Sequence, residues 1–154
     1  MSPAPEIGSS VTGGERARAL VSVEVLLRLL RHVRDCFPDD DLETVVVYLT
    51  VVAASVGAHV RDPELLASLG DKDLPAQFIR PTSGRAIAES TGLPRESVRR
   101  RIDALVAQGR LARDGRGVRS VEGTMHIGRN REFVQALIQE LNAAPGKLAR
   151  FDGL

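Results

Sequence analysis

The stretch of sequence that decides the fold covers residues 83–121 and reads SGRAIAESTGLPRESVRRRIDALVAQGRLARDGRGVRSV. Its first part contains two amphipathic runs, residues 84–91 and residues 94–108, with only two residues between them. In the second run, Val98, Ile102 and Leu105 recur at three- and four-residue spacings, which indicates a helix. Gly109 follows the second run, where a glycine commonly ends a helix. The sequence therefore predicts two helices joined by a very tight turn.

The residues around this turn meet the steric demands of two closely crossing helices. Ala88 is small enough for the crossing point, and Gly92 accepts the positive φ that a tight turn needs. Leu93 is expected in the core, and Pro94 stands beside the first turn of the second helix, where its missing N–H costs nothing. Val98 then faces inward. This spacing predicts a helix-turn-helix over residues 84–108.

Two short alternating runs follow the second helix. Residues 110–113 and 118–121 are joined by Asp114–Gly115–Arg116–Gly117. Glycine-containing turns between alternating runs are typical of a β-hairpin. We therefore expect a small basic hairpin over residues 110–121, which carries Arg113, Arg116 and Arg119.

Charge is distributed unevenly along the chain. The 154 residues carry a net charge of only +1, with 43% hydrophobic and 27% charged residues, as in ordinary globular proteins. Residues 80–131 nevertheless hold twelve arginines and five acids, a net charge of +7, while the remainder holds nine basic and fifteen acidic residues, a net charge of −6. Such a division favours a polyanionic partner for the basic segment.

Further helices are expected on both sides of this segment. Residues 1–14 read as a flexible tail. Residues 15–34 form a helix that is apolar around much of its circumference, and the segment 15–35 is expected to dimerise. Burial on two sides, against its own domain and a second subunit, and burial in a single core both remain open. A C-terminal helix over residues 131–142 is expected to have one apolar face.

The segment before the helix-turn-helix is less regular. Residues 42–58 are rich in valine, but their length favours a buried helix over a strand. This apolar run is also shorter than the roughly 20 residues of a membrane span. A short helix over residues 64–69, a polar connection over residues 70–77 and a short edge strand over residues 78–82 follow.

The stretch 83–121 resembles the winged helix-turn-helix transcriptional regulators of bacteria, broadly of the MarR/GntR-like kind. The resemblance implies a mainly α-helical fold with a small β-hairpin wing: a winged helix-turn-helix domain over residues 42–125, with additional N- and C-terminal helices. It also implies binding of double-stranded DNA as a homodimer, with residues 94–108 as recognition helix. Ligand sensing is common among such proteins, but the sequence does not identify a small-molecule effector.

A projection of the second helix at about 100° per residue gives the candidate DNA contacts. With Val98, Ile102 and Leu105 inward, Arg100 lies on the opposite face. Arginine suits bidentate contact with guanine, whereas Glu96 has two readings, as an acceptor for cytosine or as a charge that stabilises the helix N-terminus. The candidate DNA-binding residues are Thr82, Ser83, Arg85, Arg95, Glu96, Ser97, Arg99, Arg100, Arg113, Arg116 and Arg119.

The sequence gives little support to other kinds of site. The single cysteine, Cys36, excludes an intrachain disulfide, and His32, His59 and His126 lack the spacing of metal ligands. No catalytic residues, no metal and no cofactor are therefore expected, and no membrane contact. The absence of a signal peptide favours a cytoplasmic location. Two alternatives to DNA binding stay open: a winged domain that contacts another protein, and an enzyme.

Overall fold

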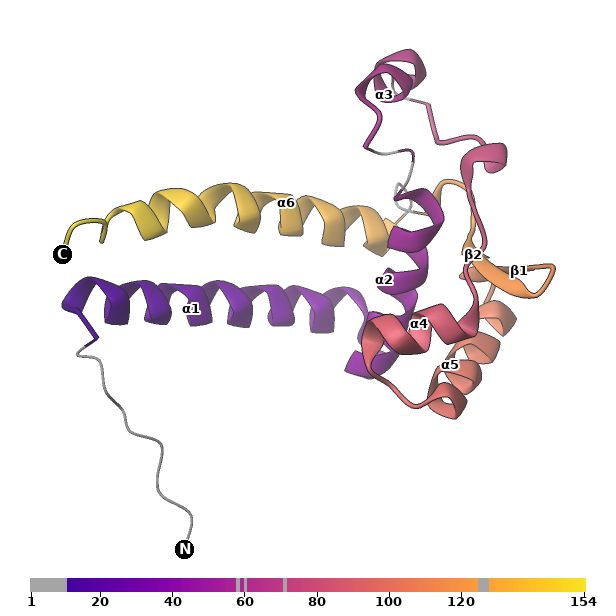
Figure 1. Cartoon of the computed structure of the whole chain (residues 1–154), viewed down its shortest axis with the longest axis horizontal. Helices are drawn as coiled ribbons and strands as arrows, with labels where there is room; N and C mark the ends of the chain where they lie inside the picture. Colours follow the sequence, from indigo (N-terminus) through magenta and orange to yellow (C-terminus); the bar gives the residue numbers. More distant parts are fainter. Residues whose placement is uncertain (1–10, 58, 60, 71, 125–127) are drawn as a thin grey trace, which may run out of the picture. The chain divides into compact units, whose positions relative to one another are not determined.

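The computed structural model describes residues 11–57, 59, 61–70, 72–124 and 128–154, and it is mainly helical with one small hairpin (Figure 1). The elements are α1 (Gly13–Cys36), α2 (Leu42–Val56), α3 (Pro63–Leu69), the 3-10 turn η1 (Ala76–Phe78), α4 (Gly84–Thr91), α5 (Arg95–Ala107), β1 (Leu111–Asp114), β2 (Gly117–Ser120) and α6 (Gly128–Ala149). Two compact units divide the chain: Val33–Glu132, and the residues before and after that segment. The prediction of a mainly helical fold with a hairpin is confirmed.

The α2 helix is the centre of the Val33–Glu132 unit. It begins after Asp41, whose carboxylate accepts a hydrogen bond from the Thr44 amide at 2.7 Å and so satisfies a free N–H of the first turn. The expected helix is confirmed, and it ends at Val56. Burial of several faces explains its apolar composition. The buried side chains of α2 are those of Val45, Val47, Tyr48, Val51, Val52 and Ser55.

The two strands form an antiparallel hairpin that packs through one face. Leu111 pairs with Ser120 and Asp114 pairs with Gly117, so that a two-residue turn joins the strands. Gly115 occupies the first position of this turn with φ of 57°, which favours glycine. The Ser120 amide donates to Ser55 Oγ at 3.0 Å, and this buried bond ties β2 to α2.

The strand predicted over residues 78–82 is wrong. Phe78 instead closes the 3-10 turn, and only Thr82 pairs with the hairpin, through an isolated antiparallel bridge to Val118. Both bridge hydrogen bonds are short, at 2.8 and 2.9 Å. Pro81 has no N–H to donate, which limits extended pairing at this position.

The start of α1 also differs from the prediction. The helix begins at Gly13, because Thr12 and Glu15 form a capping box. Thr12 Oγ1 accepts from the Glu15 amide at 3.1 Å, and Glu15 Oε2 accepts from the Thr12 amide at 2.8 Å. Residues 13 and 14 of the predicted tail are therefore helical, and residues 1–10 lie outside the described residues.

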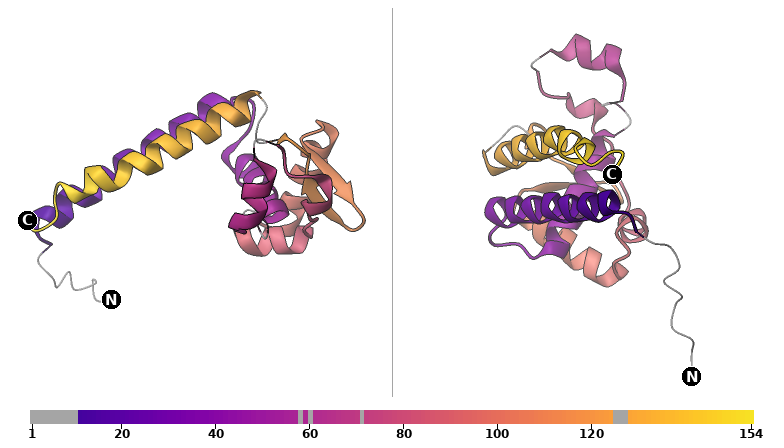
Figure 2. Two further views of the ribbon diagram at one scale, coloured as in Figure 1. Left: turned by 90° about the horizontal axis from the view of Figure 1, so that it is seen from above. Right: turned by 90° about the vertical axis from the view of Figure 1, so that its left-hand side faces the viewer.

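The α6 helix is longer than predicted and continues through Pro145 to Ala149. It runs antiparallel to α1, and the two helices lie side by side (Figures 1 and 2). Arg28 of α1 donates to Glu140 at 2.9 Å, and Arg18 pairs with Asp152 at 3.2 Å. Contacts along this hairpin stabilise the turns beyond Asn142, whereas an internal proline disfavours a helix on its own.

Candidate nucleic-acid interface

The α4–α5 pair has the tight turn that the sequence predicts. Ser83 caps α4 by accepting from the Ala86 amide at 3.1 Å. Gly92 ends α4 with φ of 72°, and its amide donates to the Ala88 carbonyl at 2.9 Å. At the far end of α5, the amides of Gly109 and Arg110 donate to carbonyls of the last turn, as in a Schellman motif. Local capping thus accounts for both ends of α4 and for the C-terminal end of α5, whereas α5 begins after Pro94 without a side-chain cap.

Gly92→Ala is expected to lower the free energy of unfolding by about 1–2 kcal/mol, since an L-residue is strained at this φ. A Cβ at Gly92 meets no atom within 4 Å, so the cost comes from the backbone alone. Gly146→Ala is the matched control: it too meets no atom, but it lies within α6 without a positive φ. Urea unfolding followed by circular dichroism compares the two variants. Equal midpoints for G92A and the wild type would contradict the strain.

The faces of α5 are those predicted by the projection. Val98, Ile102 and Leu105 are buried against the body of the Val33–Glu132 unit. Arg99 and Arg100 are exposed, while Ser97 is half-buried. One face of this helix therefore anchors it, and the opposite face offers arginine side chains to solvent.

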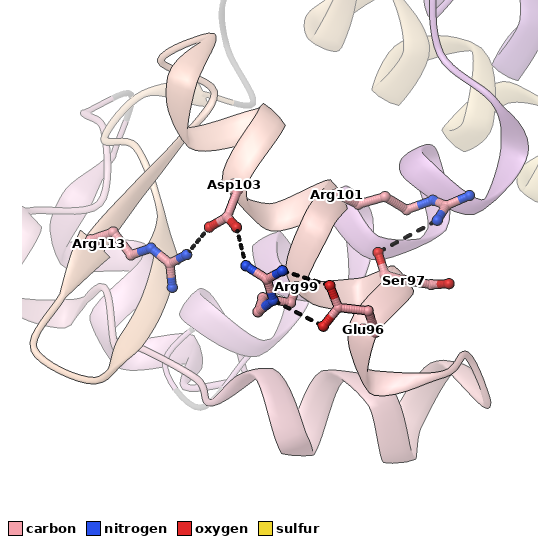
Figure 3. Close-up of polar contacts among 6 residues, drawn as sticks. All are labelled: Glu96, Ser97, Arg99, Arg101, Asp103 and Arg113. Carbon is pink, nitrogen blue, oxygen red and sulfur yellow. Dashed lines mark hydrogen bonds and ion pairs between the residues drawn. The ribbon is translucent and has the colours of Figure 1, made fainter.

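An ion-pair network joins the exposed face of α5 to the hairpin (Figure 3). Arg99 donates two hydrogen bonds to the Glu96 carboxylate, at 2.5 and 3.0 Å, and a third to Asp103 at 3.1 Å. The other oxygen of Asp103 accepts from Arg113 of β1. These two acids and two arginines form a cluster with no net charge. We refer to Glu96, Arg99, Asp103 and Arg113 as the Asp103 network.

The ion pair between Glu96 and Arg99 shifts the pKa values of both side chains. The hydrogen bond from Arg99, and then the charge of the same guanidinium, hold the pKa of Glu96 below its ordinary value. The hydrogen bond to Glu96 correspondingly raises the pKa of Arg99. Both side chains remain charged at neutral pH. The structure thus adds a third role to the two considered for Glu96: its carboxylate binds the Arg99 guanidinium.

Three of the predicted arginines form no ion pair with any described residue. Arg95 lies at the start of α5, Arg100 lies on its exposed face, and Arg116 lies in the turn of the hairpin. All three side chains are exposed. Among the predicted arginines they are the most available to an anionic partner, because no carboxylate in the described part of the chain has to be displaced.

The remaining predicted residues have partners within the unit. Arg85 pairs with Glu89 at 2.7 Å, and Arg119 pairs with Asp114 at 3.2 Å. Ser83 uses its hydroxyl as a helix cap, and Thr82 forms the bridge to Val118 through its backbone. Contact between these residues and a partner would therefore involve exchange of existing bonds or the backbone.

Two arginines of the basic segment point into the unit. Arg101 is 11% exposed and pairs with Asp41 at 3.0 Å and with Glu43. Arg110 pairs with Asp40 at 2.7 Å, and its guanidinium lies over the Tyr48 ring at 4.6 Å from the centroid. Both tie the α5–hairpin region to the start of α2. They reduce the charge that the basic segment presents to solvent.

The sequence reasoning did not select Asp103 as a site residue. At about 100° per residue, Asp103 lies about 140° from Val98, on the exposed face, and four positions after Arg99. That spacing is the signal for the bond within α5. The contact with Arg113 depends on the position of β1 beside α5, which helical periodicity does not give.

A polar cleft of about 500 Å³ lies beside the Cys36–Asp40 loop and includes Arg110, Arg129 and Asn130. Burial, as the main cause, raises the pKa of the Cys36 thiol, which disfavours a reactive thiolate. Among the described residues, no group of three or more His, Cys, Asp or Glu side chains could hold a metal ion; His126 lies outside them. A membrane-crossing helix is likewise not found in the described segments.

Comparison with known proteins gives no match to any family model, any curated protein or any solved structure. The features of this unit that point to a function are the α4–α5 pair, the β1–β2 hairpin and the arginines without an ion-pair partner in the described residues.

Proposed function

We propose that this protein is a sequence-specific regulator of transcription that binds double-stranded DNA. In this proposal the Val33–Glu132 unit is a winged helix-turn-helix domain. The α5 helix enters the major groove, and the β1–β2 hairpin acts as the wing on the backbone or in the minor groove.

The observation that carries the proposal is the exposed arginine face of α5 opposite its buried face. Val98, Ile102 and Leu105 hold the helix to its unit, so the other face is free to meet a groove. Arg100 has no ion-pair partner among the described residues, and in this proposal its guanidinium contacts guanine. Arg95 and Arg116 flank it in sequence on either side and suit phosphates.

A homodimer is part of the proposal, and it is supported by the apolar surface of the α1–α6 hairpin. Within the described residues of the α1–α6 hairpin, Gly14 is the only buried residue of α1 and Phe133 is the only buried residue of α6. Val25 and Leu29, on either side of Arg28, are half-buried, whereas Leu20 and Leu27 are 61% and 57% exposed. The other exposed apolar side chains of the hairpin are Val23, Leu26, Leu30, Ile138 and Leu141.

A second copy of this chain is the occupant that fits this surface. Two helices alone cannot bury both sides of a helix that is apolar around much of its circumference. Pairing two such hairpins forms a four-helix bundle, which covers the open side of α1 without an additional protein. Two copies also supply two recognition helices for a palindromic site.

Binding to DNA over a series of salt concentrations tests the proposal. We expect fluorescence anisotropy to show tighter binding to a duplex from the protein's own promoter region than to a random duplex. Arg95 and Arg116 from two protomers give four phosphate contacts, so log K should fall with log salt with a slope of at least about 3. Weak binding that does not depend on salt, with no preference for the promoter, would contradict the proposal.

The Asp103 network favours one alternative, a winged domain that contacts another protein. Its four members on α5 and β1 cancel one another's charge, and a mixed-charge surface suits a protein partner. The same salt series separates the two functions, because release of counterions from phosphates produces a steep slope.

A further inference from the structure

Asp103 is the point at which the exposed face of α5 and the hairpin are joined. One carboxylate oxygen accepts from Arg99 of the same helix at 3.1 Å, and the other accepts from Arg113 of β1. No other side chain in the described residues bonds to arginines of both elements on this face. Figure 3 shows Asp103 between the two guanidinium groups.

Stability of the fold does not account for this arrangement. The side chains of Arg99, Asp103 and Arg113 are all close to half-exposed or more, at 63%, 46% and 49%. Exposed ion pairs contribute little to folding, because water screens them and long side chains lose entropy. The arrangement instead controls which cations are free on this face.

We propose that Asp103 is a specificity-determining residue of the DNA-binding surface. It is a positioning residue: it holds Arg99 and Arg113 in defined orientations and keeps them from binding phosphates indiscriminately. This inference rests on the proposed DNA-binding function and adds to it the residue that sets the balance between specific and non-specific binding.

The physical reason lies in what each kind of DNA has to displace. On a random duplex, a phosphate gains Arg113 only by replacing the Asp103 carboxylate, one anion for another, and the carboxylate repels nearby phosphates. On the correct sequence, arginines that are already oriented lose less side-chain entropy on binding. Asp103 therefore penalises random DNA more than the preferred site.

The test is Asp103→Asn, which keeps the shape of the side chain and removes its charge. The probes are a random-sequence duplex and a duplex that the wild-type protein selects from a randomised library. For D103N we expect a roughly 3- to 10-fold gain in affinity for the random duplex, with a salt slope steeper by about 1 per protomer. Affinity for the selected duplex should change by less than about 2-fold, so that the specificity ratio falls.

Two further variants show whether the effect comes from released arginines. Glu122→Gln removes the same charge from an exposed carboxylate that pairs with no described arginine, and it should leave the salt slope unchanged. In the double variant D103N/R113A, the slope should return toward the wild-type value. If E122Q and D103N changed the salt slope and the affinity for random DNA equally, the proposal would be overturned, because the change in net charge alone would explain both effects.

Failure of the inference is distinct from failure of the function. If the wild-type protein binds the selected duplex specifically and D103N has the same specificity ratio and salt slope, Asp103 has no such role and the DNA-binding function stands. If the wild-type protein selects no sequence, or binds without dependence on salt, both proposals are overturned. Far-UV circular dichroism confirms that each variant keeps its helices.

Discussion

Leu27→Glu is expected to disrupt the proposed homodimer, so that the variant is a monomer, and to lower the affinity for a two-half-site duplex by more than about 100-fold. Leu27 is 57% exposed in the single chain and lies on the open side of α1. In the proposed dimer, a carboxylate at this position would be buried between the α1–α6 hairpins of the two protomers without a charged partner, which costs several kcal/mol. A monomer then binds each half-site alone and loses the second set of contacts.

Sedimentation velocity measures the oligomeric state, and anisotropy measures the affinity. Gln139→Glu is the matched control, since it adds the same charge to an exposed polar position of α6. It should leave the dimer and DNA binding intact. A wild-type protein that sediments as a monomer, or an L27E variant that still sediments as a dimer, would exclude this surface as the interface.

Arg100→Ala is expected to give the second largest effect, a loss of about 10- to 100-fold in affinity for the selected duplex. A bidentate contact with guanine is worth about 1–3 kcal/mol of discrimination. Arg100 has no ion pair with the described residues, so its removal leaves none of their carboxylates without an ion-pair partner. Binding to random DNA should weaken only a few-fold, because phosphate contacts elsewhere are unchanged.

Arg99→Ala should have a smaller effect than Arg100→Ala, although both should weaken specific binding. Arg99 is already bonded to Glu96 and Asp103, so part of its charge is neutralised within the chain. Arg150→Ala, which removes an exposed arginine after α6 with no ion-pair partner in the described segments, is the control. Unchanged affinity of both R99A and R100A would show that α5 does not read the DNA.

Much of the site region could be predicted because its determinants are local. Ser83 caps α4, Gly92 takes a positive φ, and Gly109 ends α5, and each of these features depends on residues within a few positions. The amphipathic spacing of Val98, Ile102 and Leu105 gave the buried face of α5 for the same reason. A capping box at Thr12 and Glu15 also had a local signal, which the tail prediction overlooked.

The predicted elements are wrong where contacts with residues distant in sequence determine the secondary structure. Residues 78–82 look extended, but β2 offers pairing only to Thr82, so no third strand forms. An internal Pro145 suggests an early end to the last helix, but contacts between α1 and α6 extend that helix to Ala149. In both cases the local propensity is weak compared with the contacts available.

The sequence by itself determined the helices, their tight turn, the hairpin and the concentration of arginine in residues 80–131. Tertiary structure decided the state of the arginines that pair with another element, because such an ion pair depends on distances that helical periodicity does not give. It paired Arg101 and Arg110 with carboxylates at the start of α2, paired Arg113 with Asp103, and left Arg100 without an ion-pair partner among the described residues. The number of charged residues can be counted in the sequence. Which arginines are available to a partner depends on where the fold positions the carboxylates that pair with them.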